Sequence, residues 1–265
     1  MVALSTPGDA VLSLGTSTTL LLATSPASTP PARFTTSHLL AHPISSDAYI
    51  AMLCYKNGAL AREKVRNEHA DGDWARFNEL VTATPPGNDG FWGLYFPLPE
   101  IIPPNVVGNF YFETQDGTAT PTQVRALPET AHPRAILESQ LLSIRARVAA
   151  ILHQDAHLRR LVLTGGASTN STIRQLSADL FGIPVYVAED TSEAAAIGGA
   201  LLARYAWWNN IDGTRNSFER MRARDAERIK LVAVPDEKIA KVYDGLVETY
   251  SLCEKFVVNE CNRVE

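Results

Sequence analysis

The run Leu161-Val162-Leu163-Thr164-Gly165-Gly166-Ala167-Ser168-Thr169-Asn170 decides the fold class. Its first three residues are apolar and predict a short buried strand, and the glycine pair lets the backbone turn tightly. Ser168, Thr169 or Asn170 can cap the helix that follows. That helix is indicated by an apolar stripe and by the residues that stop it: Ile173, Leu176, Leu180, Gly182 and Pro184. A strand that leads through glycines into a helix is expected in an α/β domain.

The turn at Gly165-Gly166 has two interpretations. A strand that passes through glycines into a helix N-terminus presents free N–H donors and the positive end of the helix dipole, which suits a phosphate or a nucleotide. The alternative is a plain strand-to-helix connection without a ligand. The motif alone leaves both open.

The composition restricts the class of protein. The chain has 265 residues, 45% of them hydrophobic and 20% charged, with a net charge of −5. This balance is ordinary for a globular protein, and it argues against a nucleic-acid partner, which needs a basic face. Three cysteines, Cys54, Cys253 and Cys261, show no metal-ligand spacing and fit a reducing compartment. The apolar run 11–23 is interrupted by polar residues, so it predicts neither a signal peptide nor a membrane span, and we expect a cytoplasmic protein.

A hairpin is predicted near the start of the sequence. Strands at Asp9–Leu14 and Thr18–Ala23 are joined by Gly15-Thr16-Ser17. The tip offers backbone N–H groups and two hydroxyls, an arrangement that can grip phosphate oxygens. A simple hairpin is the alternative. A third strand is predicted at Phe34–Leu40, and His38 and His42 near its end are interpreted as structural.

The next hundred residues predict helices and then irregular structure. From Ala48 the pattern is interpreted as helical, with a buried run Tyr49–Leu53 and a helix at Ala59–Asn67. A second helix begins near Asp71-Gly72-Asp73 and carries Trp74 on its apolar face. The pattern favours a core role for Trp74 over a ligand contact. The segment Thr84–Asn109 is rich in proline and glycine and is predicted to be irregular.

The second half predicts an alternation of helices and strands. A long helix from Pro133 to about His153 has a regular apolar stripe, and the last helix, from about Asp236, has a second one that should dock on the domain. The other expected elements are a strand at Val185–Val187, a helix starting at Asp190–Glu193, a loop at Asn209–Asn216 and a solvated helix face at Phe218–Arg228.

In this order the elements resemble one ribonuclease-H-like domain of the actin-like ATPase superfamily, an α/β fold with a mixed sheet and helices on both faces. Two motifs, Ser13-Leu14-Gly15-Thr16-Ser17 and Thr164–Asn170, are similar to the phosphate and adenosine motifs of the FGGY carbohydrate kinases. Further matches point to the eukaryotic xylulokinases within that family: Met52–Gly58, Arg62–Asn67, Gly93–Phe96 and Arg134–Glu138. The resemblance covers residues 1–265 as one C-terminal nucleotide-binding domain.

The resemblance implies a nucleotide site. Gly165, Gly166 and Asn170 would lie against the adenosine of ATP, and Trp74 matches the position of a nucleotide-contacting tryptophan. Gly15, Thr16 and Ser17 would face the phosphates, with Mg²⁺ bound through the nucleotide. D-xylulose is the second substrate of the full-length family, and no membrane or nucleic acid is implied.

The catalytic residue of the family is expected to lie outside this sequence. In the family a Gly-Asp-Asn element, whose Asp is the base, precedes the Ser-Leu-Gly-Thr-Ser strand, whereas Asp9 stands in Gly-Asp-Ala at the start of the first strand. We also expect the N-terminal sugar-binding domain to be absent, which makes the chain a fragment, a truncated gene model or a separately encoded subunit. No catalytic residue and no metal ligand is therefore predicted here.

Four functional hypotheses follow. The first is a xylulokinase half that needs a separate N-terminal kinase domain. The second is a non-catalytic nucleotide-binding fragment, favoured for the isolated chain, and the third is an FGGY kinase for glycerol, gluconate or ribulose. The fourth, a dinucleotide-dependent oxidoreductase, is disfavoured because the sequence lacks a Gly-x-Gly-x-x-Gly turn followed by an acid about twenty residues on.

Overall fold

The apolar run Leu161–Leu163 is the middle of strand β8 (Arg160–Thr164), which lies parallel to β1 (Asp9–Leu14). The computed structural model describes residues 4, 6–24, 36–45, 48–115, 120–152, 157–188, 194–211, 218–222 and 229–262. Among these, β1 and β8 belong to a seven-stranded sheet in the order β10-β9-β8-β1-β2-β4-β3. The remaining strands of that sheet are β2 (Thr18–Ala23), β3 (Ser37–Ala41), β4 (Tyr49–Tyr55), β9 (Val185–Ala188) and β10 (Ile229–Ala233).

The sheet is mixed, as predicted. The pairs β1–β8 and β8–β9 are parallel, while β1–β2, β2–β4, β3–β4 and β9–β10 are antiparallel. The predicted hairpin is therefore correct, with β1 and β2 joined through Gly15-Thr16-Ser17. A second, three-stranded antiparallel sheet contains β5 (Phe91–Phe96), β6 (Gly108–Glu113) and β7 (Thr122–Val124).

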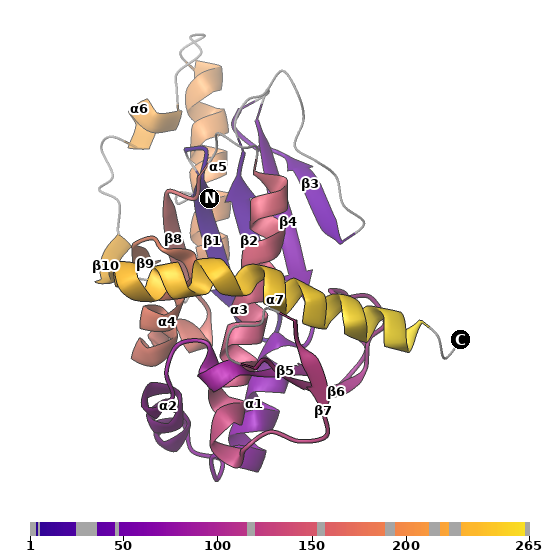
Figure 1. Cartoon of the computed structure of the whole chain (residues 1–265). Coiled ribbons are helices and arrows are strands. Elements are labelled where there is room, and N and C mark those ends of the chain that lie inside the picture. Colours follow the sequence, from indigo (N-terminus) through magenta and orange to yellow (C-terminus); the bar gives the residue numbers. More distant parts are fainter. Residues whose placement is uncertain are drawn as a thin grey trace.

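Helices lie on both sides of the large sheet. In Figure 1, α3 and α7 pass in front of it and α5 stands behind it. The helices are α1 (Gly58–His69), α2 (Trp74–Ala83), α3 (His132–Ile151), α4 (Ser171–Phe181), α5 (Ala194–Ile211), α6 (Phe218–Arg222) and α7 (Glu237–Cys261). Short 3₁₀ turns are η2 (Asn88–Gly90), η3 (Glu129–Ala131) and η4 (Gly166–Thr169). The expected α/β class, a mixed sheet with helices on both faces, is confirmed.

The core confirms the predicted helical stripes. On α3 the buried stripe is Leu137, Leu141, Ile144, Val148 and Ile151, on α4 it is Ile173, Leu176 and Leu180, and on α7 it includes Tyr243, Tyr250, Cys253 and Val257. The last helix therefore docks on the domain. Gly182 ends α4 in the left-handed conformation, with φ of +65°. Within the described ranges, no helix combines the length and apolar character needed to cross a membrane.

The helical interpretation of Tyr49–Leu53 is wrong. These residues belong to β4, which pairs with β2 on one side and with β3 on the other. A strand with partners on both edges is largely buried, so a continuous apolar run lacks the alternation that would distinguish it from a helix. The helix begins only at Gly58, the first residue of α1.

The segment Thr84–Asn109 is less irregular than predicted, since its aromatic run Phe91–Phe96 forms β5 and pairs with β6. Asn209 to Ile211 continue α5 instead of starting a loop. Phe218 and Met221 of α6 are buried, so that helix is not a fully solvated face. Parts of several predictions lie outside the described residues: 34–35, His153, 190–193, 212–216 and 223–228.

Candidate nucleotide site

Two turns meet at one edge of the large sheet. Because β1 and β8 are parallel neighbours with Ser13 opposite Thr164, the turns that follow both strands lie side by side. Gly165 has φ of +81°, and a Cβ there would lie 2.7 Å from the amide nitrogen of Gly15. Only glycine fits this approach, so the Gly15–Ser17 tip and the Gly165-Gly166 turn are in backbone contact.

Gly166 has a different environment. A Cβ built on Gly166 would meet no atom within 4 Å, so this residue borders open space. The turn is held by its own hydroxyls, because Ser168 Oγ donates to the Gly165 carbonyl at 2.7 Å and Thr169 Oγ1 donates to the Gly166 carbonyl at 2.9 Å. The result is a fixed turn with an accessible backbone at its crest.

Asn170 is the residue that caps α4, out of the three predicted candidates. Its Oδ1 accepts a hydrogen bond from the amide of Ile173 at 3.2 Å, and its Nδ2 donates to Oδ1 of Asn78 at 2.8 Å. Asn78 belongs to α2, so Asn170 joins the glycine turn to that helix.

Trp74 is the first residue of α2 and is half-buried. Its ring meets Phe77 edge-on at 5.2 Å, and the guanidinium of Arg66 lies 4.8 Å from the ring centre. Trp74 and Asn78 are four residues apart and so share one face of the helix. The contact between Asn78 and Asn170 brings that face toward the glycine turn. Part of the Trp74 ring packs on the core, as the pattern predicted.

The hairpin tip is bound to the segment before α1, which was not predicted from the sequence. Ser17 Oγ donates to the Lys56 carbonyl at 3.2 Å, and the Ala59 amide donates to the Thr16 carbonyl at 3.3 Å. A Cβ on Gly58 would lie 2.2 Å from Thr18 Oγ1, so glycine is required for this approach. The only signal in the sequence was the family-like run that contains Lys56 and Gly58.

Asp9 lies at the opposite end of β1 from the tip. Its side chain is buried, and its carboxylate pairs with Arg159 at 3.0 Å and with Arg160 at 3.1 Å. The six residues of β1 place it roughly 17–20 Å from the tip at the usual strand rise. The expectation that Asp9 is remote from the tip is confirmed.

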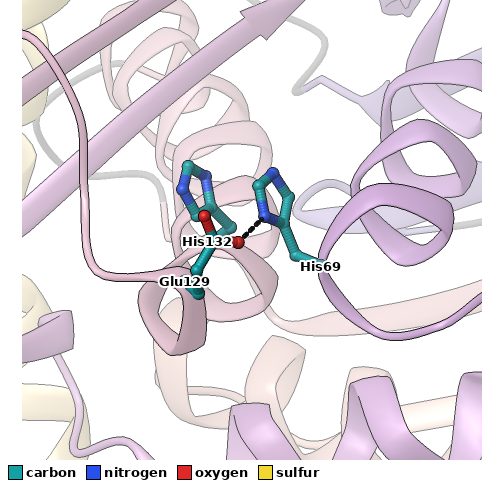
Figure 2. A group of neighbouring side chains, drawn as sticks. All are labelled: His69, Glu129 and His132. Carbon is teal, nitrogen blue, oxygen red and sulfur yellow. Dashed lines mark hydrogen bonds and ion pairs between the residues drawn. The ribbon is translucent and has the colours of Figure 1, made fainter.

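A separate cluster, His69, Glu129 and His132, has the donor atoms of a transition-metal site. Figure 2 shows the two imidazole rings one over the other, with centroids 3.7 Å apart and planes inclined by 4°, and Glu129 reaching His69 at 2.6 Å. The lone pairs of parallel rings lie in parallel planes and cannot converge on one ion at bonding distance.

Tyr95 Oη also meets His132 Nδ1 at 2.7 Å. Burial and the neighbouring His69 lower the pKa of His132 to about 4, which favours its neutral imidazole in this packed position.

The two histidines interpreted as structural, His38 and His42, lie on β3 and directly after it. His42 Nδ1 accepts from the amides of Ile44 and Ser45, at 3.3 and 3.1 Å, and so closes a turn. His38 is exposed on β3.

The fold and the paired glycine turns define an actin-like ATPase domain of the sugar-kinase type. Residues 10–207 match the model of the FGGY family of carbohydrate kinases, C-terminal domain, and the chain belongs to that family. It is 33% identical to the xylulose kinase of Mus musculus, over 97% of this chain and 44% of that protein. The chain thus spans about half the length of the curated relatives that it matches.

Solved structures show the same fold. The xylulose kinase from Lactobacillus acidophilus superposes with a TM-score of 0.73 at 17% identity, over 97% of this chain and 49% of that one. The gluconate kinase from the same organism also gives a TM-score of 0.73, at 18% identity and with the same coverage. Because kinases for two different substrates fit equally well, the fold alone does not select the sugar.

Proposed function

We propose that this domain is the nucleotide-binding half of an ATP-dependent sugar kinase and that the complete enzyme converts D-xylulose to D-xylulose 5-phosphate. The observation that carries the proposal is the backbone contact between Gly165 and Gly15, which joins a phosphate-type hairpin tip to a glycine turn at a helix start. The similarity to xylulose kinases supports this choice of sugar over glycerol, gluconate or ribulose.

The assigned roles follow from the groups at this edge. We assign Gly165, Gly166 and Asn170 to the adenosine, with Trp74 on the neighbouring helix, because open backbone at Gly166 lets a flat ligand approach. Gly15, Thr16 and Ser17 are assigned to the phosphates through their backbone N–H groups and the Thr16 hydroxyl.

The tip fits Mg²⁺ that arrives with the nucleotide. The described contacts of residues 15–17 are with carbonyl and amide groups and include no carboxylate. Mg²⁺ usually keeps several waters and binds substrate phosphates, and in phosphoryl transfer it neutralises charge on the phosphate oxygens. The tip amides, including that of Ser17, would then hold the phosphates while the ion remains with the nucleotide.

The second candidate function is nucleotide binding without catalysis. Asp9 favours it, because this carboxylate is buried between two arginines and cannot serve as a base at the tip. In this proposal the base and the sugar pocket belong to a separate N-terminal kinase domain.

Free thiols at Cys54, Cys253 and Cys261 support a reducing, cytoplasmic location.

A pair of glycine variants tests the nucleotide site. Gly166→Val places a side chain in the open space where the adenosine is assigned, and Gly245→Val adds the same side chain at an equally open glycine on α7. We expect wild type and Gly245→Val to bind Mg-ADP weakly, far short of submicromolar affinity, because these residues span about half the length of the curated relatives and supply only part of the proposed site. Gly166→Val should bind at least about tenfold more weakly. Calorimetry measures this. Equal affinities for the two variants would refute the placement of the adenosine. Submicromolar binding would refute the expectation that these residues form only part of the nucleotide site.

A further inference from the structure

A buried carboxylate lies behind the segment that contacts the hairpin tip. Glu100 is 8% exposed, and its Oε1 accepts hydrogen bonds from the amides of Lys56, at 2.5 Å, and Ile101, at 2.7 Å. Its Oε2 accepts from the amide of Asn57 at 2.9 Å. One side chain therefore fixes two consecutive amides of the turn Lys56-Asn57-Gly58 from 43 and 44 residues away in the sequence.

This turn is the support of the tip. The carbonyl of Lys56 accepts from Ser17 Oγ, and the amide of Ala59, just after the turn, donates to the carbonyl of Thr16. A shift of the turn therefore moves two of the three tip residues. Asn57 Nδ2 adds bonds to the carbonyls of residues 98 and 99, next to Glu100, at 3.3 and 3.1 Å.

Packing alone does not fix the turn. A cavity of about 30 Å³ borders Asn57, Gly58 and Glu100, on the side that faces α3 and β5. From α3, Gln140 Nε2 reaches across to the Gly58 carbonyl at 3.0 Å. With open space beside it, the position of the turn depends on directional hydrogen bonds, and Glu100 accepts those of both backbone amides, Lys56 and Asn57.

We propose that Glu100 is a positioning residue for phosphate binding: its carboxylate fixes the Lys56–Gly58 turn and thereby holds Gly15–Ser17 in the conformation that binds nucleotide phosphates. This inference rests on the proposed function, because it assigns the tip to the phosphates. Glu100 acts through the turn and does not itself touch the nucleotide.

Glu100→Gln isolates this role. A carboxylate accepts at both oxygens, whereas an amide accepts at one and donates at the other. In either orientation of the amide, an N–H of Lys56 or Asn57 loses its acceptor and faces a donor. The size and burial of the side chain stay nearly unchanged, so the core is preserved.

Glu138→Gln is the matched control. Glu138 is also buried and its Oε1 also accepts a backbone N–H, from Gly87 at 3.1 Å, but its other partners are Arg134 and Tyr243, away from the tip. This variant shows the effect of losing a buried carboxylate without disturbing the Lys56–Gly58 turn.

The binding experiment compares Mg-ADP with adenosine, which lacks phosphates. We expect Glu100→Gln to bind Mg-ADP about tenfold more weakly than wild type and adenosine with unchanged affinity, while Glu138→Gln keeps the wild-type ratio of the two affinities. An equal loss for both ligands, or no loss for Mg-ADP, would overturn the proposal.

Amide hydrogen exchange tests the same mechanism without a ligand. The Ala59 amide has its acceptor in the tip, at the Thr16 carbonyl, so its exchange reports whether the turn and the tip stay together. We expect Glu100→Gln to speed exchange at Ala59 about tenfold and Glu138→Gln to leave it unchanged. Unchanged exchange in Glu100→Gln overturns the positioning role. Failure of wild type to bind either ligand would instead refute the proposed function.

Discussion

Gly165 and Gly166 are neighbours, but the structure requires glycine only at Gly165. At Gly165 the backbone has φ of +81° and approaches the chain of Leu14 and Gly15, whereas Gly166 borders open space. The sequence predicts a tight turn from the pair, but it does not show which residue touches the hairpin. That contact joins segments 150 residues apart and follows from the parallel pairing of β1 with β8.

The first residue-scale prediction concerns Gly165→Ala. A Cβ would lie 2.7 Å from backbone atoms of residues 14 and 15, in a conformation that L-residues rarely adopt. We expect unfolding in urea to show a loss of about 2–4 kcal/mol, from strain and overpacking together. Gly182→Ala is the control, because its φ is +65° but its Cβ would have 3.7 Å of room. A loss at Gly165 no larger than at Gly182 would contradict the close approach of the two turns.

The lowered pKa of His132 leads to a prediction of how the free energy of unfolding depends on pH. Its pKa is lowered from 6.5 to about 4 by burial and by His69, while Glu129 opposes the shift. The folded state therefore binds fewer protons than the unfolded state below pH 6.5, so this contribution to stability is present above pH 6.5 and is lost as the pH falls toward 4.

Replacing His132 should flatten that dependence. We expect the urea midpoint of His132→Gln to fall less between pH 7.5 and pH 5 than that of wild type, because the variant has no imidazole to protonate. His38→Gln, at an exposed histidine of β3, should keep the wild-type slope. Parallel slopes for His132→Gln and wild type would show that this histidine is not the sensor.

At the scale of elements, the long helices and the strands β1, β2 and β8 could be predicted from the sequence, whereas β4 and β5 could not. The helices α3 and α7 each bury one stripe, so their apolar residues recur at helical spacing. Strand β4 has partners on both edges, and β5 pairs with a strand that begins twelve residues after it ends. These partners, rather than local sequence, decide the structure there.

The core role of α3 is tested by Leu141→Ala. Leu141 is 3% exposed in the middle of the helix, so the substitution leaves a cavity between α3 and its neighbours. We expect it to lower the free energy of unfolding by about 2–5 kcal/mol. Ala149→Ser, on the exposed face of the same helix, should change it by less than about 0.5 kcal/mol. A similarly small change for Leu141→Ala would contradict the packing.

At the scale of the whole molecule, the strand order places the Gly15–Ser17 tip and the Gly165-Gly166 turn side by side, at the carboxyl ends of β1 and β8. This arrangement was predicted by resemblance to a family, since hairpin tip and glycine turn are each ambiguous alone. The hydrogen bonds that hold these two turns in place were not predicted. Glu100 meets Lys56 across 44 residues and Asn170 meets Asn78 across 92, and neither pair leaves a periodic signal in the sequence.

The position of Asp9 also belongs to this scale, because it bears on whether the chain can catalyse alone. Its carboxylate is fully buried, accepts from the amide of Thr6 and pairs with Arg159 and Arg160. These bonds hold it at the start of β1, and the tip is at the other end of the strand. A substitution there removes the buried carboxylate that Arg159 and Arg160 share, which costs stability rather than a catalytic proton transfer.

We therefore predict that the 265-residue chain alone releases no ADP above background with D-xylulose and Mg-ATP. General-base catalysis is worth roughly a hundred- to ten-thousand-fold, and among the described residues the printed contacts of the tip include no carboxylate to perform it. These 265 residues span about half the length of the curated relatives, so we do not expect them alone to close over the sugar and align its hydroxyl. A coupled ADP-release assay measures this, and adding the N-terminal half of a related xylulose kinase should raise the rate. Asp9→Asn should lower the unfolding free energy by about 1–3 kcal/mol. Turnover by the chain alone that disappears in a still-folded Asp9→Asn variant would overturn both the need for a second domain and the structural role of Asp9.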